Sequence, residues 1–151
     1  MVSCTEFIPL YSELFKYIED KSDHDAVVRY WHEIAEKYVR QRLGGLVAEK
    51  GMAGCWEYWS HSLNEEAADF IMEYDDEENT FSIHMRHCPS AGMLNEMEHM
   101  EPYHDYCGHC VELYPPILKE YGIMSDEKDS FVDQKTASCR ESYYIPKSKA
   151  D

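Results

Sequence analysis

The stretch AADFIMEYDDEENTFSIHMRHCP, residues 67–89, decides the fold of this chain. Apolar and polar residues alternate on both sides of the acidic run at 75–79, which predicts two strands joined by a solvated turn, the second ended by Pro89. One face of the second strand is expected to carry Phe81, Ile83, Met85 and His87. The opposite face is expected to carry Ser82, His84, Arg86 and Cys88.

A helical period precedes these strands. Residues 5–20 repeat apolar side chains at intervals of three and four, which predicts one amphipathic helix. Residues 22–45 carry a longer stripe and predict a helix that ends at Gly44–Gly45. That stripe consists of Val27, Val28, Trp31, Ile34, Ala35, Tyr38, Val39 and Leu43. Residues 46–62 are expected to be helical as well, although Gly51 and Gly54 weaken the pattern.

The chain after Pro89 mixes short helices with one more strand. Residues 90–100 predict a short helix, and a second helix is expected from Pro102, broken at Pro115–Pro116 and resumed as far as Gly122. Residues 132–146 predict a third strand. The pattern therefore predicts a single α+β domain over residues 1–151, in which a helical N-terminal half packs on a small antiparallel sheet with a cysteine-bearing helix.

The composition excludes several classes of partner. The 151 residues are 44% hydrophobic and carry 30 acidic against 14 basic side chains, a net charge of −16. Such a charge repels nucleic acid and anionic membrane surfaces. No apolar run approaches the roughly 20 residues that cross a bilayer. The N-terminus lacks the basic and apolar regions of a signal peptide. We therefore expect a cytoplasmic protein that contacts neither nucleic acid nor membrane.

The cysteines are the most informative residues. In the cytosol thiols stay reduced, so they are better interpreted as ligands, reactive groups or small core residues than as three disulfides. The six positions are Cys4, Cys55, Cys88, Cys107, Cys110 and Cys139. Two of them lie within one turn in DYCGHC, residues 105–110, so both sulfurs can face one point.

Three interpretations of this pattern remain open from the residues alone. The first is a metal site, for zinc or an iron–sulfur cluster, held by Cys88, Cys107, Cys110 and Cys139. Spare ligands for it would be His84, His87 and His104. The second is plain packing, because free cysteine is among the most buried residue types. The third is thiol redox chemistry, since CGHC is also a disulfide-isomerase motif, but the polar residues before it do not predict the buried strand that such chemistry needs.

The C-terminal half also resembles a known family. RHCPSAGML, DYCGHCVELYPPILKEYGI and KTASCRESYYI, within residues 68–146, are similar in order and spacing to the L-2-amino-thiazoline-4-carboxylic acid hydrolase family. A weaker similarity extends to the 4-vinyl-reductase-type small-molecule-binding domains, although their glycine-rich stretch is not evident here. The hydrolase resemblance implies opening of a five-membered thiazoline ring by attack of water on its C=N carbon.

That chemistry assigns roles to particular side chains. A histidine is the default base near neutral pH, and His84 and His104 are the candidates. A thiolate nucleophile is the other route, with Cys107 before Cys110 because it lies nearer the N-terminal end of the expected helix. The substrate carboxylate needs a cation, for which the candidates are Arg86 and Arg140. An aromatic wall for the substrate is expected from Trp59.

Two functions of different classes therefore follow. The leading hypothesis is a hydrolase acting on a small C=N heterocycle that carries a carboxylate. The alternative is a non-catalytic module that binds a small ligand, or senses zinc, through the cluster of Cys88, Cys107, Cys110 and Cys139. Both predict a small-molecule partner, and both leave the cofactor open. The exposed aromatic faces of the N-terminal helices would be compatible with a homodimer.

Overall fold

The computed structural model describes residues 4–65 and 68–147. The N-terminal helices are α1 (Cys4–Lys21), α2 (His24–Ile34), a π-helical segment η1 (Ala35–Gly44), α3 (Gly45–Lys50) and α4 (Met52–Glu65). The strands are β1 (Asp69–Asp75), β2 (Thr80–His87), β3 (Met124–Ser125), β4 (Phe131–Asp133) and β5 (Ser138–Tyr144). Three short helices lie between β2 and β3: α5 (Pro89–Glu96), α6 (Gly108–Leu113) and α7 (Pro115–Glu120). The predicted α+β class and its helical N-terminal half are confirmed.

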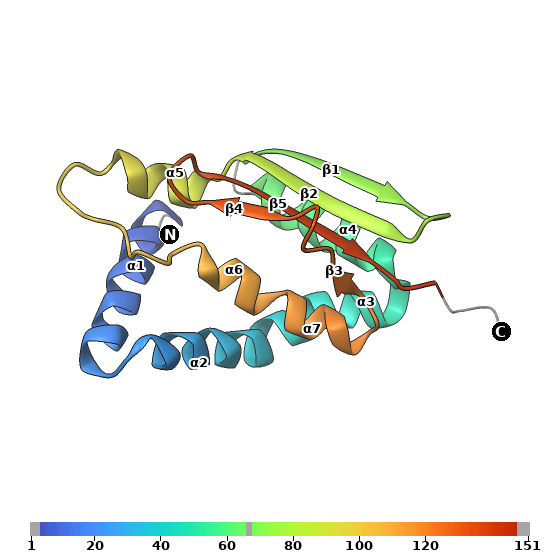
Figure 1. Cartoon of the computed structure of the whole chain (residues 1–151), viewed down its shortest axis with the longest axis horizontal. Coiled ribbons are helices and arrows are strands. Elements are labelled where there is room, and N and C mark those ends of the chain that lie inside the picture. Colours follow the sequence, from blue (N-terminus) through green and yellow to red (C-terminus); the bar gives the residue numbers. More distant parts are fainter. Residues whose placement is uncertain (1–3, 66–67, 148–151) are drawn as a thin grey trace.

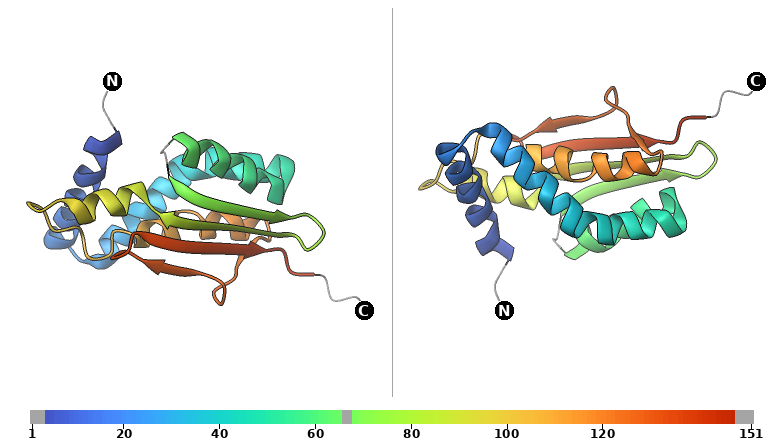
Figure 2. Two further views of the ribbon diagram at one scale, coloured as in Figure 1. Left: turned by 90° about the horizontal axis from the view of Figure 1, so that it is seen from above. Right: turned by 90° about the horizontal axis from the view of Figure 1, so that it is seen from below.

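The strands form one antiparallel sheet. Its order is β1-β2-β5-β3, with β4 paired to β5, so the first and last long strands of the sequence meet through β2. In the register of β2 and β5, Phe81 lies opposite Tyr143 and Met85 lies opposite Cys139. The helices gather on one face of this sheet (Figures 1 and 2). None of the helices in the described ranges is both long and apolar enough to cross a bilayer.

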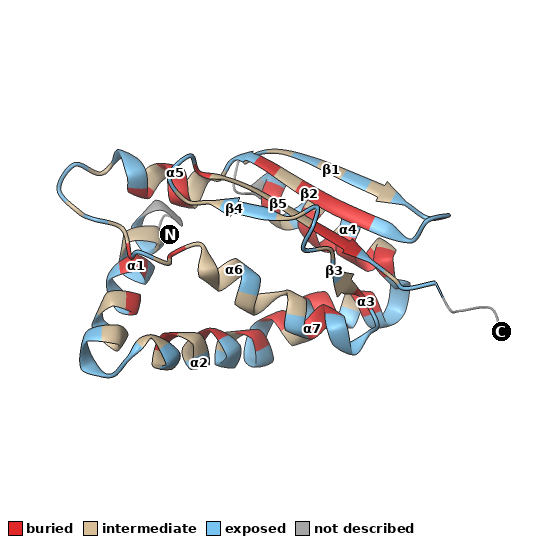
Figure 3. Cartoon of the chain, viewed as in Figure 1, coloured by how far each residue is buried: buried red, intermediate tan, exposed pale blue. Residues whose placement is uncertain are grey.

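Two buried clusters hold the layers together. The first joins the sheet to η1, α3, α4 and α7, and includes Trp59, Phe81 and Tyr143. The second joins α1 and α2 to α5 and to the loop before α6, and includes Trp31 and Tyr103. Figure 3 shows this burial along β2 and β5 and on the sides of the helices that face them. The sequence period predicted the buried faces of β2 and of much of α2, but in α1 the side chains of Phe7, Tyr11 and Leu14, which made the predicted stripe, are exposed and Phe15 is buried instead. The loop residues of the second cluster carried no such signal.

The long N-terminal helix does not end at Gly44–Gly45 as predicted. The chain continues through η1 into α3 and turns at Gly51, whose φ of 59° suits glycine. In η1 the hydrogen bonds run from residue i to i+5, which widens the turn. The buried residues Ala35, Val39, Leu43 and Gly44 follow that wider period. Tyr38, predicted to share the buried stripe, is 51% exposed.

The segment before the two close cysteines is not helical, contrary to the prediction of a helix from Pro102. Residues 101–103 have no regular structure, residues 104–107 form a turn, and α6 begins only at Gly108 with Cys107 as its N-cap. The break before the two prolines is confirmed in part: it falls at Tyr114, and Pro115 starts α7 as a first-turn residue. His104 therefore lies in a turn and not one helical turn before Cys107.

Residues 132–146 were predicted as one strand but form a hairpin of β4 and β5. The carboxylate of Asp133 accepts hydrogen bonds from the backbone N–H groups of Lys135 and Thr136, and Ala137 has a φ of 54°. An Asp that binds the backbone two residues later favours a turn. The apolar residues on both sides of this turn concealed it in the sequence.

Cys88 lies on the other side of the sheet from the one predicted. The alternation of β2 ends at His87, and Cys88 becomes the N-cap of α5, with extended φ and ψ of −76° and 120°. Its side chain faces the same cavity as Ile83 and Met85. Cys88 therefore does not share a face with His84 and Arg86, because the strand period no longer applies at a helix cap.

Gly54 allows the close packing of α3 and α4. A Cβ atom at this position would lie 2.5 Å from the carbonyl oxygen of Leu46 and 2.8 Å from the backbone nitrogen of Val47. We expect Gly54→Ala to lower the free energy of unfolding by about 1–3 kcal/mol in urea titrations, since backbone atoms must move apart.

Gly45→Ala is the matched control. A Cβ atom there meets nothing within 4 Å, and the residue has the helical φ of −60°. This variant should gain about 0.5–1 kcal/mol, because alanine loses less backbone entropy in a helix. Equal gains in both variants would show that α3 and α4 are not in close contact.

Candidate functional site

The candidate site is a cavity of about 150 Å³ between the sheet and α6, which we name the thiol pocket. All four late cysteines line it: Cys88, Cys107, Cys110 and Cys139. They come from the end of β2, the start of α6, the body of α6 and from β5. The other lining residues are Trp59, Ser62, Leu63, Ile83, Met85, Ser90, Tyr106, His109, Tyr114, Val132, Ala137, Ser138 and Glu141. Four sulfurs distant in the sequence thus converge on one space.

The pocket forms where the two buried clusters meet. Cys88 and Cys139 pack against the first cluster, while Cys107 packs against the second. Aromatic rings make much of the wall, and Trp59, predicted as a substrate-binding residue, is among them. Small side chains at the junction of two cores leave space that larger residues would fill, so the cysteines maintain the cavity as well as lining it.

His109 and Cys110 form a hydrogen-bonded pair in the wall. The Nδ1 atom of His109 bonds to the carbonyl oxygen of Tyr106, which can only accept, so Nδ1 carries the proton. In the neutral imidazole Nε2 is then an acceptor, and it lies 3.4 Å from Sγ of Cys110. The thiol of Cys110 therefore donates to Nε2. Burial lowers the pKa of His109, which keeps this acceptor unprotonated.

A carboxyl group lies beside the thiols. Glu141 follows Cys139 by two residues on β5 and lines the same cavity. Its Oε2 atom accepts a hydrogen bond from the hydroxyl of Tyr143. Burial raises the pKa of Glu141, although the bond from Tyr143 opposes this shift. The pocket thus combines a proton donor or acceptor with a thiol and an imidazole.

Burial holds three thiols of the pocket neutral, those of Cys107, Cys110 and Cys139. Burial, followed by the nearby Cys88, raises the pKa of Cys107 to about 12. Burial and then Glu141 raise the pKa of Cys139 to about 12 and that of Cys110 well above its ordinary value of 9.0. The start of α6 does not lower the pKa of Cys107, as the sequence had suggested, because its desolvation outweighs the effect of so short a helix.

The raised pKa values of the buried thiols can be tested by alkylation. We expect Cys107 and Cys139 to react with iodoacetamide at least about 100-fold more slowly in the native protein at pH 7.5 than in urea, because raising a pKa from 9.0 to about 12 removes about 1,000-fold of the thiolate. Mass spectrometry of the peptides measures each residue. Native rates that level off below pH 9 would contradict the raised pKa values.

The raised pKa values of Cys107 and Cys139 also make the free energy of unfolding depend on pH. The unfolded thiols ionise near 9.0 and the folded ones near 12, so the stability they contribute is present below pH 9 and is lost as the pH rises to 12.

The two histidines predicted as bases lie elsewhere. His104 is exposed, and its Nε2 atom lies 2.9 Å from a carboxylate oxygen of Glu19 on α1. His84 pairs with Arg140 across β2 and β5, and its ring lies 6.0 Å from that of Phe131. Neither lines the thiol pocket. The structure therefore brings His109, and not these two, to the cysteines.

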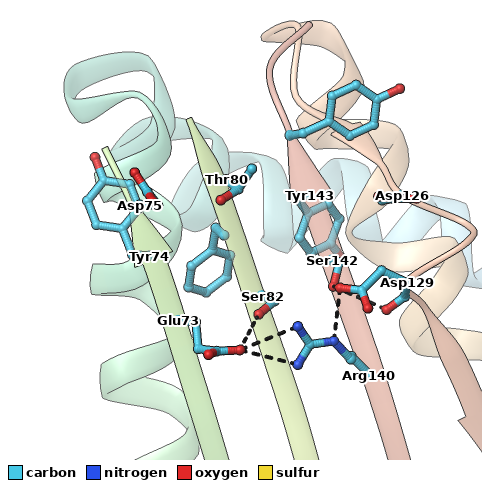
Figure 4. Close-up of a pocket in the computed structure, with 12 residues that line it drawn as sticks. Glu73, Tyr74, Asp75, Thr80, Ser82, Asp126, Asp129, Arg140, Ser142 and Tyr143 are labelled. Carbon is cyan, nitrogen blue, oxygen red and sulfur yellow. Dashed lines mark hydrogen bonds and ion pairs between the residues drawn. The ribbon is translucent and has the colours of Figure 1, made fainter. Parts of the chain in front are cut away.

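The two predicted arginines are also outside the thiol pocket. Arg86 is exposed and binds Asp69 of β1 through Nε and Nη2, at 3.0 and 2.6 Å. Arg140 lies on the opposite face of the sheet, where its guanidinium meets Asp129 at 3.0 Å and Glu73 at 3.4 Å (Figure 4). The described residues that line the pocket include no arginine or lysine, so none of them offers a cation to a carboxylate.

The pocket does not have the geometry of a closed metal site. Within residues 4–65 and 68–147, one group of three His, Cys, Asp or Glu residues has ligand atoms all within 4.8 Å of one another, and it is Glu19, His24 and His104. No three donors of the thiol pocket are that close. Zinc coordination by Cys88, Cys107, Cys110 and Cys139 would require their side chains to move inward.

Of the other two cysteines, Cys55 is fully buried in the first cluster, and the side chain of Cys4 is outside the described part.

The sequence analysis did not include two residues of the site, although the position of each in the sequence indicated it. His109 stands between the two cysteines of CGHC, where a ligand or base was sought one turn earlier. Glu141 follows Cys139 by two residues, so the strand period alone places both on one face. Because residues two apart in a strand share a face, Glu141 could have been predicted to lie beside Cys139.

Comparison of the chain with protein-family models, with curated proteins and with solved structures finds no match.

Proposed function

We propose that the thiol pocket is the active site of a small hydrolase that opens a C=N heterocycle of the aminothiazoline type. The observation that carries this proposal is the Cys110–His109 pair, with Sγ 3.4 Å from an imidazole nitrogen left unprotonated by the bond to Tyr106. A thiol held against an oriented base within a cavity is the arrangement that nucleophilic cysteine chemistry requires.

The step follows from the protonation states. Sγ of Cys110 attacks the C=N carbon, and its proton passes to Nε2 of His109. The bond from that carbon to the ring sulfur breaks, and the ring sulfur leaves as a thiol with the proton that His109 returns. Water then adds to the carbon of this S-linked isothiourea, the bond from that carbon to Sγ of Cys110 breaks, and Sγ regains a proton from the added water through His109. One water is therefore consumed for each ring, and the product is a ring-opened urea that carries a free thiol. Because both groups begin neutral, the pair needs no preformed thiolate in the buried site.

The size and the charge of the pocket also restrict which substrates can bind. Cavities of about 150 Å³ hold one small ring. The carboxyl group of Glu141 beside the cysteines can accept a hydrogen bond from the amino group of an amidine, whereas no cation among the described lining residues would bind a carboxylate. We therefore infer that the substrate is an uncharged or cationic ring, and that a ring-bound carboxylate, if present, points toward the entrance. This departs from the carboxylate-bearing substrate that the family resemblance implies.

The proposal is tested with two rings, 2-aminothiazoline and its 4-carboxylate. Proton magnetic resonance follows the appearance of the ring-opened thiol. We expect the protein to open the uncarboxylated ring faster than the carboxylate. Ring opening no faster than in buffer for both compounds would refute the function, and faster opening of the carboxylate would refute the inferred substrate charge.

The zinc-binding alternative rests on the same four cysteines and stays a prediction. It is favoured by the sulfur-rich lining, since thiolates bind zinc strongly. It is opposed by the separation of the donors described above. Elemental analysis of protein purified without added metal separates the two proposals, and a zinc content that is lost in Cys110→Ala would favour the binding module.

A further inference from the structure

A second cluster of donors lies outside the thiol pocket, on the side of the loop before α6 that faces α1 and α2. It joins Glu19 near the end of α1, His24 at the start of α2 and His104 in the turn before α6. The loop that follows α5 runs back past α1 before it enters α6, which brings these distant segments together (Figure 1). The cluster has no part in the function proposed above.

The donor atoms are close enough to share one ion. Oε2 and Oε1 of Glu19 lie 2.9 and 3.2 Å from Nε2 of His104. Oε1 of Glu19 lies 3.6 Å from Nδ1 of His24. One ligand atom from each of the three residues lies within 4.8 Å of the other two. Two imidazole nitrogens and a carboxylate oxygen form a donor set that suits zinc and its neighbours in the first transition row.

The surroundings hold the donors in place. Nε2 of His24 lies 3.5 Å from Oδ2 of Asp105, so a metal at Nδ1 would leave the opposite nitrogen bonded to a carboxylate. Such a carboxylate behind a liganding histidine fixes its tautomer and orientation. The hydroxyl of Tyr103 lies 3.0 Å from Nδ1 of His24 and also bonds to Glu19. Tyr103 is itself buried against Phe15 and Trp31, so the base of the cluster is rigid.

The cluster is open to an ion in solution. The exposed fractions of the side chains are 28% for Glu19, 42% for His24 and 65% for His104. A net charge of −16 attracts a dication, and Asp105 adds a further negative charge at the site. Three protein ligands leave the remaining coordination positions to water.

We propose that Glu19, His24 and His104 bind one divalent transition-metal ion of the zinc class. The ion connects the corner between α1 and α2 to the turn that leads into Cys107. In the absence of the ion, the histidines of the cluster form ion pairs with carboxylates, and these pairs need protonated rings. A bound ion is coordinated by unprotonated imidazole nitrogens instead. Metal affinity therefore falls as the pH falls, because protons compete for the same nitrogens.

The test is a titration of the full chain with Co²⁺ under reducing conditions, followed by visible absorption and calorimetry. We expect one equivalent to bind without the intense near-ultraviolet band of cobalt–thiolate bonds. His104→Gln and Glu19→Gln should each weaken binding at least about tenfold. His61→Gln, which changes an exposed histidine on α4, should bind like the original chain.

Two further variants keep the result interpretable. Cys110→Ala should retain this equivalent, which separates it from metal in the thiol pocket. Asp105→Asn should weaken it by about 10–100-fold, the usual cost of removing an outer carboxylate. Absence of Co²⁺ binding, a thiolate band for the only bound equivalent, or unchanged affinity in both His104→Gln and Glu19→Gln would each overturn the proposal. Because His104 is exposed, its replacement should not unfold the chain, and circular dichroism verifies this.

Discussion

Replacement of His109 by glutamine should lower the kcat/KM for ring opening by about 10²–10⁴-fold, the usual contribution of a positioned general base. Glutamine keeps a polar group of similar reach but cannot accept the thiol proton and return it to the leaving sulfur. The Nε2 atom that it removes is the partner of Cys110 at 3.4 Å. Steady-state kinetics with 2-aminothiazoline measure the effect, and His61→Gln is the matched control.

The pH profile separates a base from a merely structural histidine. Burial lowers the pKa of His109 below the ordinary 6.5, so the unprotonated, active form persists to lower pH than for an exposed histidine. We expect the rate to fall on the acidic side only below pH 6.5, and this limb should vanish in His109→Gln. Full activity of His109→Gln, or an acid limb above pH 7, would contradict the assignment.

Replacement of Trp59 by alanine should lower the free energy of unfolding by about 3–5 kcal/mol, as expected for loss of a large buried ring. Trp59 is 4% exposed and stacks against Phe81 and Tyr143, with ring centroids at 5.6 and 6.0 Å. Its ring also contacts those of Tyr58 and Tyr114, each at 5.3 Å. Urea unfolding followed by circular dichroism measures the loss.

Trp56→Ala on the same helix is the control. Trp56 is 41% exposed, so its removal should cost about 1 kcal/mol or less. Similar losses in the two variants would mean that Trp59 does not join α4 to the sheet. Since Trp59 also lines the thiol pocket, Trp59→Ala should enlarge the cavity and weaken substrate binding together with stability.

The elements that depend on a local period were predictable. The alternation around 75–79 predicted β1, β2 and the turn between them, and the apolar stripe after Ser22 predicted α2. In both cases neighbouring residues alone decide which side faces the core. The period failed where the local structure changes from one element to the next: at Cys88, which caps α5, at Gly44, where the helix continues into α3, and in residues 132–146, where Asp133 bonds to the backbone two residues later and turns the chain.

Composition and spacing by themselves determined that this is an acidic α+β domain whose late cysteines come from one short helix and the flanking strand ends. They did not decide which imidazole meets the sulfurs, because His84, His104 and His109 all lie within four residues of a late cysteine, and the side of the sheet or turn on which each ring lies depends on the tertiary structure. The pairing of β2 with β5 and the fold of the loop before α6 determine which histidine lies next to the cysteines. Long-range pairing fixes directions in space that no local period encodes.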